Sequence, residues 1–132
     1  GDIFVARVAG NFVNEDILGS MEFACKVAGA KIILVMGHEH CGAVKAAIDD
    51  VKLGNISAML TKIKPAVEMA EYEGERNSNN DEFVHQVCET NVKNNISYIR
   101  ERSPILKEMQ DTGELMIIGA VYDMDTGMVT FL

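Results

Sequence analysis

The segment "KIILVMGHEHCGAV", residues 31–44, decides how this chain folds. Its apolar first half is typical of a strand that is buried on both faces of a parallel sheet. Two histidines and a cysteine follow within residues 38–41, and "AVKAAIDDVK" (43–52) then has the pattern of a helix. A strand, a short polar turn and a helix in this order predict an α/β protein.

The rest of the chain repeats the alternation of strands and helices. Further strands are predicted at 2–8 ("DIFVARV"), 114–123 ("ELMIIGAVYD") and 128–132 ("MVTFL"). Apolar periodicity predicts helices over 14–28, 56–70 and 84–99, and Ser103 followed by Pro104 predicts one more helix start. We therefore expect a mostly parallel sheet flanked by helices, with the last strand pairing back as a C-terminal hairpin after the turn "DMDTG".

Length and composition restrict the partners of the chain. Its 132 residues form one domain, residues 1–132, and 48% of them are hydrophobic, which suffices for a core. The net charge of −8 argues against nucleic acid or an anionic membrane as the main partner. No apolar stretch approaches the length of a membrane span. The three cysteines are odd in number and widely spaced, unlike a disulfide framework, and this favours a reducing, cytoplasmic location. Export stays open, because the chain begins with Gly1 and a signal peptide would not be seen.

The His/Cys segment has three interpretations. Gly37 and Gly42 have the spacing of half a phosphate-binding loop, but Ala43 and Val44 stand where its lysine and hydroxyl residue should follow. Alternatively, His38 and Cys41 form an H-x-x-C pair at the carboxyl end of a buried strand, where α/β proteins bind ligands, and both side chains are good zinc ligands. The third interpretation is a turn without function. The metal site and the plain turn both stay open at this level.

Four segments, in order along the chain, resemble motifs of the β-class carbonic anhydrases. "GHEHCGAVKAAID" is similar to the family's H-x-x-C-G zinc motif, and "GDIFVARVAGN" to its G-D-x-F-x-x-R-x-A-G-N segment. "GSMEFACKVAGAKIILVMGH" resembles its S-x-E-[YF]-A helix and the strand after it. "GAVYDMDTGMVTFL" resembles its closing strand and hairpin. The resemblance covers nearly the whole chain.

The resemblance implies a zinc enzyme that interconverts carbon dioxide and bicarbonate and forms a homodimer or a higher homo-oligomer. It assigns His38 and Cys41 as zinc ligands and Phe4, Ala9 and Phe23 as lining of the carbon dioxide pocket. All three could instead be core residues of an ordinary α/β domain, and for Phe4 and Phe23 this interpretation has the same weight as pocket lining. Zinc would make water a nucleophile near neutral pH.

One motif of the family is missing from the chain. The family's C-x-D-x-R motif, which supplies the first zinc cysteine and an Asp-Arg pair, would lie upstream of Gly1, so this chain contains no catalytic residue of the family. The family strand that bears the motif lies inside the sheet, and its absence predicts a gap there or two unfamiliar strand partners. We expect an N-terminally incomplete domain whose 132 residues have little or no activity alone. A hydrolase of a related small molecule such as carbonyl sulfide, and a zinc-free, non-catalytic relative, remain alternatives.

The other cysteines and histidines are interpreted as structural. Cys25 and Cys88 fall on apolar helix faces and are expected to pack in the core. His40 is expected either at the surface or as a group that contacts the metal ligands without binding the metal ion. His85 lies beside the polar segment 73–82, which we expect to be a surface loop, with no partner apparent from the sequence.

Overall fold

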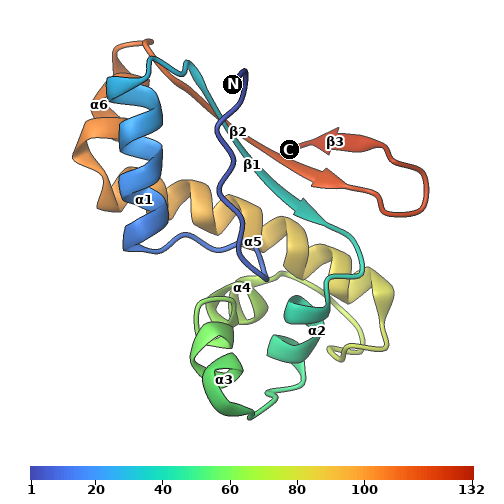
Figure 1. Ribbon diagram of the computed structural model, residues 1–132. Coiled ribbons are helices and arrows are strands. Elements are labelled where there is room, and N and C mark those ends of the chain that lie inside the picture. The colour runs from blue at the N-terminus through green and yellow to red at the C-terminus, as the bar shows by residue number, and fades with distance from the viewer.

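A three-stranded sheet packs against one long helix in the computed structural model, which describes residues 1–132 (Figure 1). In chain order the elements are α1 (Glu15–Glu22), the π-helix η1 (Phe23–Val27), β1 (Ile32–His38), α2 (Gly42–Ile48), α3 (Gly54–Leu60), α4 (Lys64–Met69), α5 (Asp81–Arg102), α6 (Pro104–Asp111), β2 (Met116–Tyr122) and β3 (Val129–Phe131). No helix is both long enough and apolar enough to cross a membrane.

The sheet has the order β1-β2-β3. β1 and β2 are parallel, with Ile32 opposite Met116 at one end and His38 opposite Tyr122 at the other. β3 returns antiparallel to β2, as a hairpin strand must. The predicted α/β fold, with a mostly parallel sheet and a C-terminal hairpin, is therefore confirmed.

The helix α5 connects the two halves of the core. Its 22 residues extend over roughly 33 Å at 1.5 Å per residue. The first half of α5 packs with α2, α3 and α4 around buried Leu60, Ile63 and Phe83. Its second half packs with the sheet, α1 and α6 around Val92 and Ile99. Figure 1 shows α5 crossing the molecule between these two groups.

Local signals in the sequence place several of the helix boundaries. The Asn14 side chain caps α1 by accepting a hydrogen bond from the Ile17 N–H at 3.0 Å. The Ser103 hydroxyl caps α6 in the same way, with Pro104 in the first turn. The single helix predicted over 56–70 is divided into α3 and α4, because Pro65 stands in the first turn of α4 and begins a new helix there.

The strand predicted at residues 2–8 does not form. These residues run as an extended trace beside the sheet (Figure 1), and residues 2–7 take part in no backbone hydrogen bond. A β-strand needs a partner to which it can donate and from which it can accept, and no strand forms hydrogen bonds with this segment. Its backbone polar groups are left to water, since residues 1–7 are exposed. The prediction was wrong because β-branched residues indicate only that a segment favours an extended conformation, and they do not show that a partner strand is present.

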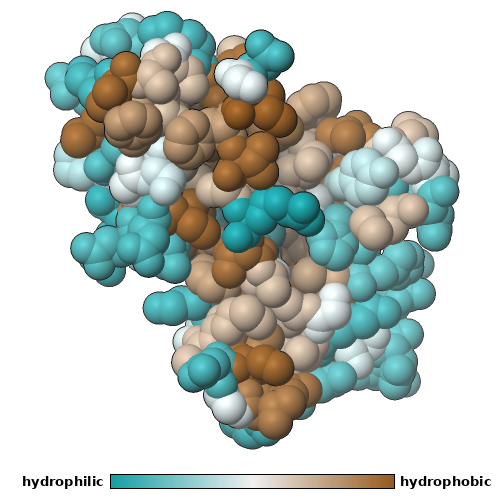
Figure 2. Space-filling view, viewed as in Figure 1, coloured by the Kyte–Doolittle hydropathy of each residue, from teal (hydrophilic) through white to brown (hydrophobic).

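The prediction that β1 is buried on both faces is also wrong. Its residues alternate between exposed and buried, and Ile32, Leu34 and Met36 keep 58%, 45% and 43% of their surface exposed. The reason is that α5 covers one face of the strand, whereas the opposite face has no comparable layer. Figure 2 shows apolar surface gathered over the part of this view where Figure 1 places the N-terminal segment and β1. β1 has β2 as its only partner, so its other edge is free. The gap expected in the sheet stays a prediction.

Candidate metal centre

The His/Cys segment forms a tight turn between β1 and α2. The parallel pairing with β2 continues one residue past β1, since the Glu39 N–H donates to the Tyr122 carbonyl at 3.0 Å. His40 then adopts a left-handed conformation, with φ of 53°, which reverses the chain. Cys41 is the residue that precedes α2, and its carbonyl accepts the first helical hydrogen bond from Lys45. The segment thus lies at the carboxyl ends of two parallel strands, the usual ligand position in α/β proteins.

His38 is exposed and its ring is oriented by a backbone group. Its Nδ1 lies 2.7 Å from the Glu39 carbonyl oxygen. A carbonyl can only accept, so Nδ1 carries the proton and donates it. In the neutral ring Nε2 then has a free lone pair, which is the form in which histidine binds a metal ion.

Cys41 is buried and is not paired with another cysteine. It retains 6% of its surface, forms no disulfide, and its side chain does not cap α2. A thiol that is not used in a disulfide or a helix cap can act as a soft ligand, and zinc accepts sulfur and imidazole nitrogen together. His38 and Cys41 therefore fit zinc as two of its ligands.

These residues do not make a complete metal site. The structure contains no group of three or more His, Cys, Asp or Glu side chains arranged to hold a metal ion. A catalytic zinc site uses three protein ligands and keeps a fourth position open. That His38 and Cys41 meet at one ion remains a prediction, and the structure shows no third ligand grouped with them.

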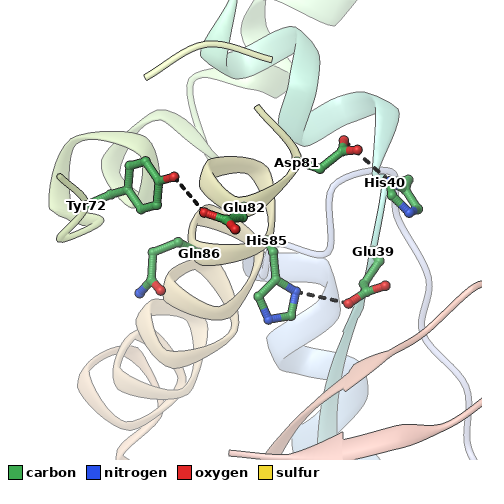
Figure 3. A pocket seen from close by; sticks show the side chains of 7 residues that line it. All are labelled: Glu39, His40, Tyr72, Asp81, Glu82, His85 and Gln86. Carbon is green, nitrogen blue, oxygen red and sulfur yellow. Dashed lines mark hydrogen bonds and ion pairs between the residues drawn. The ribbon is translucent and has the colours of Figure 1, made fainter. Parts of the chain in front are cut away.

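One face of α5 contacts the turn between the two candidate ligands. Asp81, His85 and Cys88 follow one another at spacings of four and three residues, which places them in a row that we call the α5 stripe. His85 Nδ1 lies 3.1 Å from a Glu39 carboxylate oxygen, off the direction of a good hydrogen bond, and Asp81 lies 3.7 Å from the His40 ring. Figure 3 shows both pairs facing each other across the gap between the turn and the helix.

The stripe borders a polar depression of about 420 Å³. The residues that line it are Glu39, His40, Tyr72, Asp81, Glu82, His85 and Gln86 (Figure 3). His85 also contacts Glu89 through Nε2 at 3.1 Å, so its ring lies between two carboxylates. The sequence interpretation missed this arrangement by treating His85 as a residue without partners. The helical spacing of Asp81, His85 and Cys88 could have shown that they share a face.

The three predicted pocket residues lie at the exposed N-terminal side of the molecule. Phe4 and Phe23 are 57% and 54% exposed, and their rings pack against each other with centroids 6.3 Å apart. Ala9 is also exposed. The structure brings the two aromatic residues together, as a shared pocket wall would require. Their role toward a substrate remains a prediction.

A narrow cavity separates the N-terminal segment from β1. It has a volume of about 50 Å³, with Ala6 and Val8 on one side and Leu34 and Val35 on the other. Asn11 also lines it, and the buried side-chain nitrogen of Asn11 has no hydrogen-bond acceptor. A buried donor without an acceptor is uncommon and indicates that a group able to accept belongs nearby.

Cys25 and Cys88 are buried, as predicted, with 2% and 3% of their surfaces exposed. Burial raises the pKa of the Cys25 thiol, and it raises the pKa of the Cys88 thiol to about 12.

Comparison with known proteins agrees with the motif resemblance. A sequence profile described as "Carbonic anhydrase" matches residues 1–129. Carbonic anhydrase 2 of Mycobacterium tuberculosis is 32% identical over 132 residues, which cover 96% of this chain and 61% of that protein. The carbonic anhydrase of Mycolicibacterium smegmatis is 31% identical over 134 residues, which cover 98% of this chain and 62% of that protein.

Solved structures show the same fold. The β-carbonic anhydrase CafA of Aspergillus fumigatus superposes with a TM-score of 0.86 at 29% identity, covering 100% of this chain and 64% of that one. The Coccomyxa β-carbonic anhydrase, solved in complex with acetazolamide, gives a TM-score of 0.85 at 28% identity, covering 100% and 61%. This chain therefore spans less than two thirds of the length of these relatives.

Proposed function

This chain belongs to the β-class carbonic anhydrase family, and on that premise we propose that the protein carrying it catalyses the zinc-dependent, reversible hydration of carbon dioxide to bicarbonate. The observation that carries the proposal is the position of His38 and Cys41, on either side of a tight turn at the carboxyl ends of two parallel strands. Such an enzyme is a lyase.

His38, through Nε2, and Cys41, through its thiolate, would hold the zinc ion. Bound zinc lowers the pKa of water and so supplies a nucleophile near neutral pH. The residues of this chain orient the ligands, since the Glu39 carbonyl fixes the His38 ring. Phe4 and Phe23 offer an apolar surface that suits an uncharged, linear substrate.

We further propose that the third ligand and the Asp-Arg pair come from a strand upstream of Gly1 that fits between residues 2–8 and β1. Three features support this position. β1 has one free edge, residues 2–7 are unpaired, and a narrow cavity separates the two segments. The unpaired side-chain nitrogen of Asn11 would gain an acceptor from the inserted backbone. Such a strand would make the N-terminal segment a sheet member, as the sequence pattern predicted.

The experiment compares residues 1–132 with a protein extended upstream through the C-x-D-x-R segment. We expect about one zinc per chain and rapid carbon dioxide hydration in the extended protein, and little of either in the short one, since two ligands do not retain zinc as three do. Cys41→Ser in the extended protein should lose zinc, because a neutral hydroxyl replaces a thiolate poorly. Cys25→Ser, a matched change at a buried cysteine away from the turn, should keep it.

Metal analysis and stopped-flow hydration measure these outcomes. An extended protein free of zinc and activity would contradict the proposal and favour a non-catalytic relative. Zinc without hydration, together with hydrolysis of carbonyl sulfide, would favour the related hydrolase.

We also propose that the protein forms a homodimer or a higher homo-oligomer in a reducing compartment such as the cytoplasm. Support for association comes from exposed apolar side chains, among them Ile3, Phe4 and Phe131, which are 81%, 57% and 64% exposed. Support for a reducing compartment comes from three buried cysteines without a disulfide. Sedimentation equilibrium tests the first statement, since a monomer at micromolar concentration would contradict it.

A further inference from the structure

We infer that Asn91 and Asn95 of α5 are positioning residues, because their side-chain amides fix the turn at residues 10–13. That turn in turn holds the N-terminal segment, residues 2–8, beside the candidate ligand segment, residues 38–41. The inference rests on the proposed function, since it gives the N-terminal segment a fixed place at the site. Neither amide would touch the metal ion or the substrate.

Four hydrogen bonds connect the two amides to the backbone of the turn. Asn91 Nδ2 donates to the Gly10 carbonyl at 2.8 Å and to the Asn11 carbonyl at 3.1 Å. Asn95 Nδ2 donates to the same Asn11 carbonyl at 3.1 Å, and its Oδ1 accepts from the Val13 N–H at 2.8 Å. The two side chains also bond to each other, and only 2% and 5% of their surfaces are exposed. A network of buried hydrogen bonds therefore holds the turn.

The N-terminal segment has few other attachments. Residues 2–7 take part in no backbone hydrogen bond, and the Asn11 N–H donates to the Val8 carbonyl at 3.1 Å within the turn. Val8 packs against a core cluster, whereas the Phe4 ring contacts only the exposed ring of Phe23 among aromatic residues. The position of the segment is therefore determined mainly at the end that joins the turn.

The turn lies against both ends of residues 38–41. A Cβ added to Gly37, directly before them, would lie 3.7 Å from the Asn11 side-chain nitrogen. A Cβ added to Gly10 would lie 3.2 Å from the Cβ of Ala43, shortly after them. Glycine at both positions lets the turn approach the ligand segment this closely. A shift of the turn would therefore move the N-terminal segment relative to the candidate ligands.

Other residues of α5 contact the ligand segment itself. The Cys88 sulfur, three residues before Asn91, lies 3.4 Å from the His38 carbonyl oxygen, and His85 contacts Glu39. One helix therefore touches both the ligand segment and the turn. The distance between these two parts of the site is kept constant by α5.

A purely stabilising role makes a different prediction. Buried amides that satisfy backbone groups stabilise any fold, so a change at Asn91 could lower stability and do nothing else. Ser103 is a matched control, since it is fully buried at the C-terminal end of α5. Its hydroxyl donates to Glu22 at 2.7 Å and accepts from the Leu106 N–H at 3.2 Å, and it makes no hydrogen bond to the turn. Ser103→Ala should therefore lose stability without moving the N-terminal segment.

The experiment uses the protein extended upstream through the C-x-D-x-R segment, with Asn91→Ala, Asn91→Leu and the control Ser103→Ala. Urea unfolding gives the stability, metal analysis the zinc content, and stopped-flow hydration of carbon dioxide the kcat/KM. Exchange of the Asn11 amide is followed by NMR in the zinc-free protein. Leucine has the branched shape of asparagine without its polar atoms, so Asn91→Leu separates hydrogen bonding from size.

We expect both Asn91 variants to keep their zinc, because β1 and α2 still hold the two ligands. Their kcat/KM should fall about ten-fold or more, since misplacement by about 1 Å costs up to about a hundred-fold. Exchange of the Asn11 amide should be faster in both. Ser103→Ala should keep wild-type kcat/KM and wild-type exchange at Asn11 despite its lower stability.

Three results would overturn the inference. The first is a kcat/KM of the Asn91 variants that equals that of Ser103→Ala at a similar urea midpoint. The second is wild-type exchange of the Asn11 amide in Asn91→Leu. The third is loss of zinc from the Asn91 variants alone, which would show that the amides support the ligands and not the N-terminal segment. A wild-type protein without zinc and hydration refutes the proposed function instead, and the exchange of the Asn11 amide still decides whether Asn91 holds the turn.

Discussion

The buried amide of Asn95 should contribute about 3 kcal/mol to the free energy of unfolding. Its Oδ1 accepts from the Val13 N–H at 2.8 Å, and its Nδ2 donates to the carbonyls of Asn91 at 2.7 Å and Asn11 at 3.1 Å. Asn95→Ala removes three hydrogen bonds, each with a net value of about 1 kcal/mol, and leaves a buried N–H without an acceptor. The loss should therefore reach about 3 kcal/mol.

Equilibrium unfolding in urea, followed by circular dichroism, measures this loss. With a slope of about 2 kcal/mol per molar urea, the midpoint of Asn95→Ala should fall by roughly 1.5 M at an unchanged slope. The matched control is Asn94→Ala, one residue earlier on α5, since the Asn94 side chain makes no hydrogen bond within the protein. That control should change stability by only a few tenths of a kcal/mol, in favour of alanine. Midpoints of the two variants that agree within about 0.3 M would refute the reasoning.

Two further predictions concern glycine positions and acid stability. Gly10→Ala should lower the thermal midpoint, because Gly10 has φ of 84° and an added Cβ would overlap the buried Ile63 side chain. Gly19→Ala should raise the midpoint, since Gly19 lies on α1 with open space around its Cα. Equal shifts of the midpoint in the two variants would contradict this. The hydrogen bond from Lys107 lowers the pKa of the Asp111 carboxyl in the folded protein. Asp111 should therefore stabilise the fold at pH values above the ordinary carboxyl pKa of about 3.9, and this stabilisation should be lost as the pH falls through the lowered pKa of the folded protein. Asp111→Asn should therefore be less stable than the wild type at pH 6 but not at pH 2, as thermal unfolding at both pH values would show; a gap that widens in acid would reverse the argument.

The elements that the sequence predicts well are those that local interactions determine. The Asn14 cap, the Ser103–Pro104 start and the apolar face of α5 each depend on residues within a few positions of one another. The placement of His38 and Cys41 at the end of a strand is equally local, since the apolar run and the glycines that bound the turn lie in one segment. Helix caps and strand ends could therefore be predicted from the sequence.

The errors concern features that depend on distant parts of the chain. Residues 2–8 have a strand-like composition, but a strand is a pairing, and composition carries no information about the partner. The apolar run of β1 predicted burial on both faces, yet what covers each face is decided by other elements. His85 was missed for a related reason: Glu39 and His85 are brought together only by the packing of α5 against the turn.

The order in which the chain is synthesised gives the contact between Cys88 and His38 a further consequence. The two residues are 50 positions apart, and Cys88 is made second. At typical translation rates of about 5 to 20 residues per second, His38 leaves the ribosome roughly 3 to 10 seconds before Cys88 does. During that interval the α5 neighbours of the Cys41 thiol are not yet in place, so the thiol is open to oxidants. The turn between β1 and α2 would therefore take its final position only after α5 has been completed.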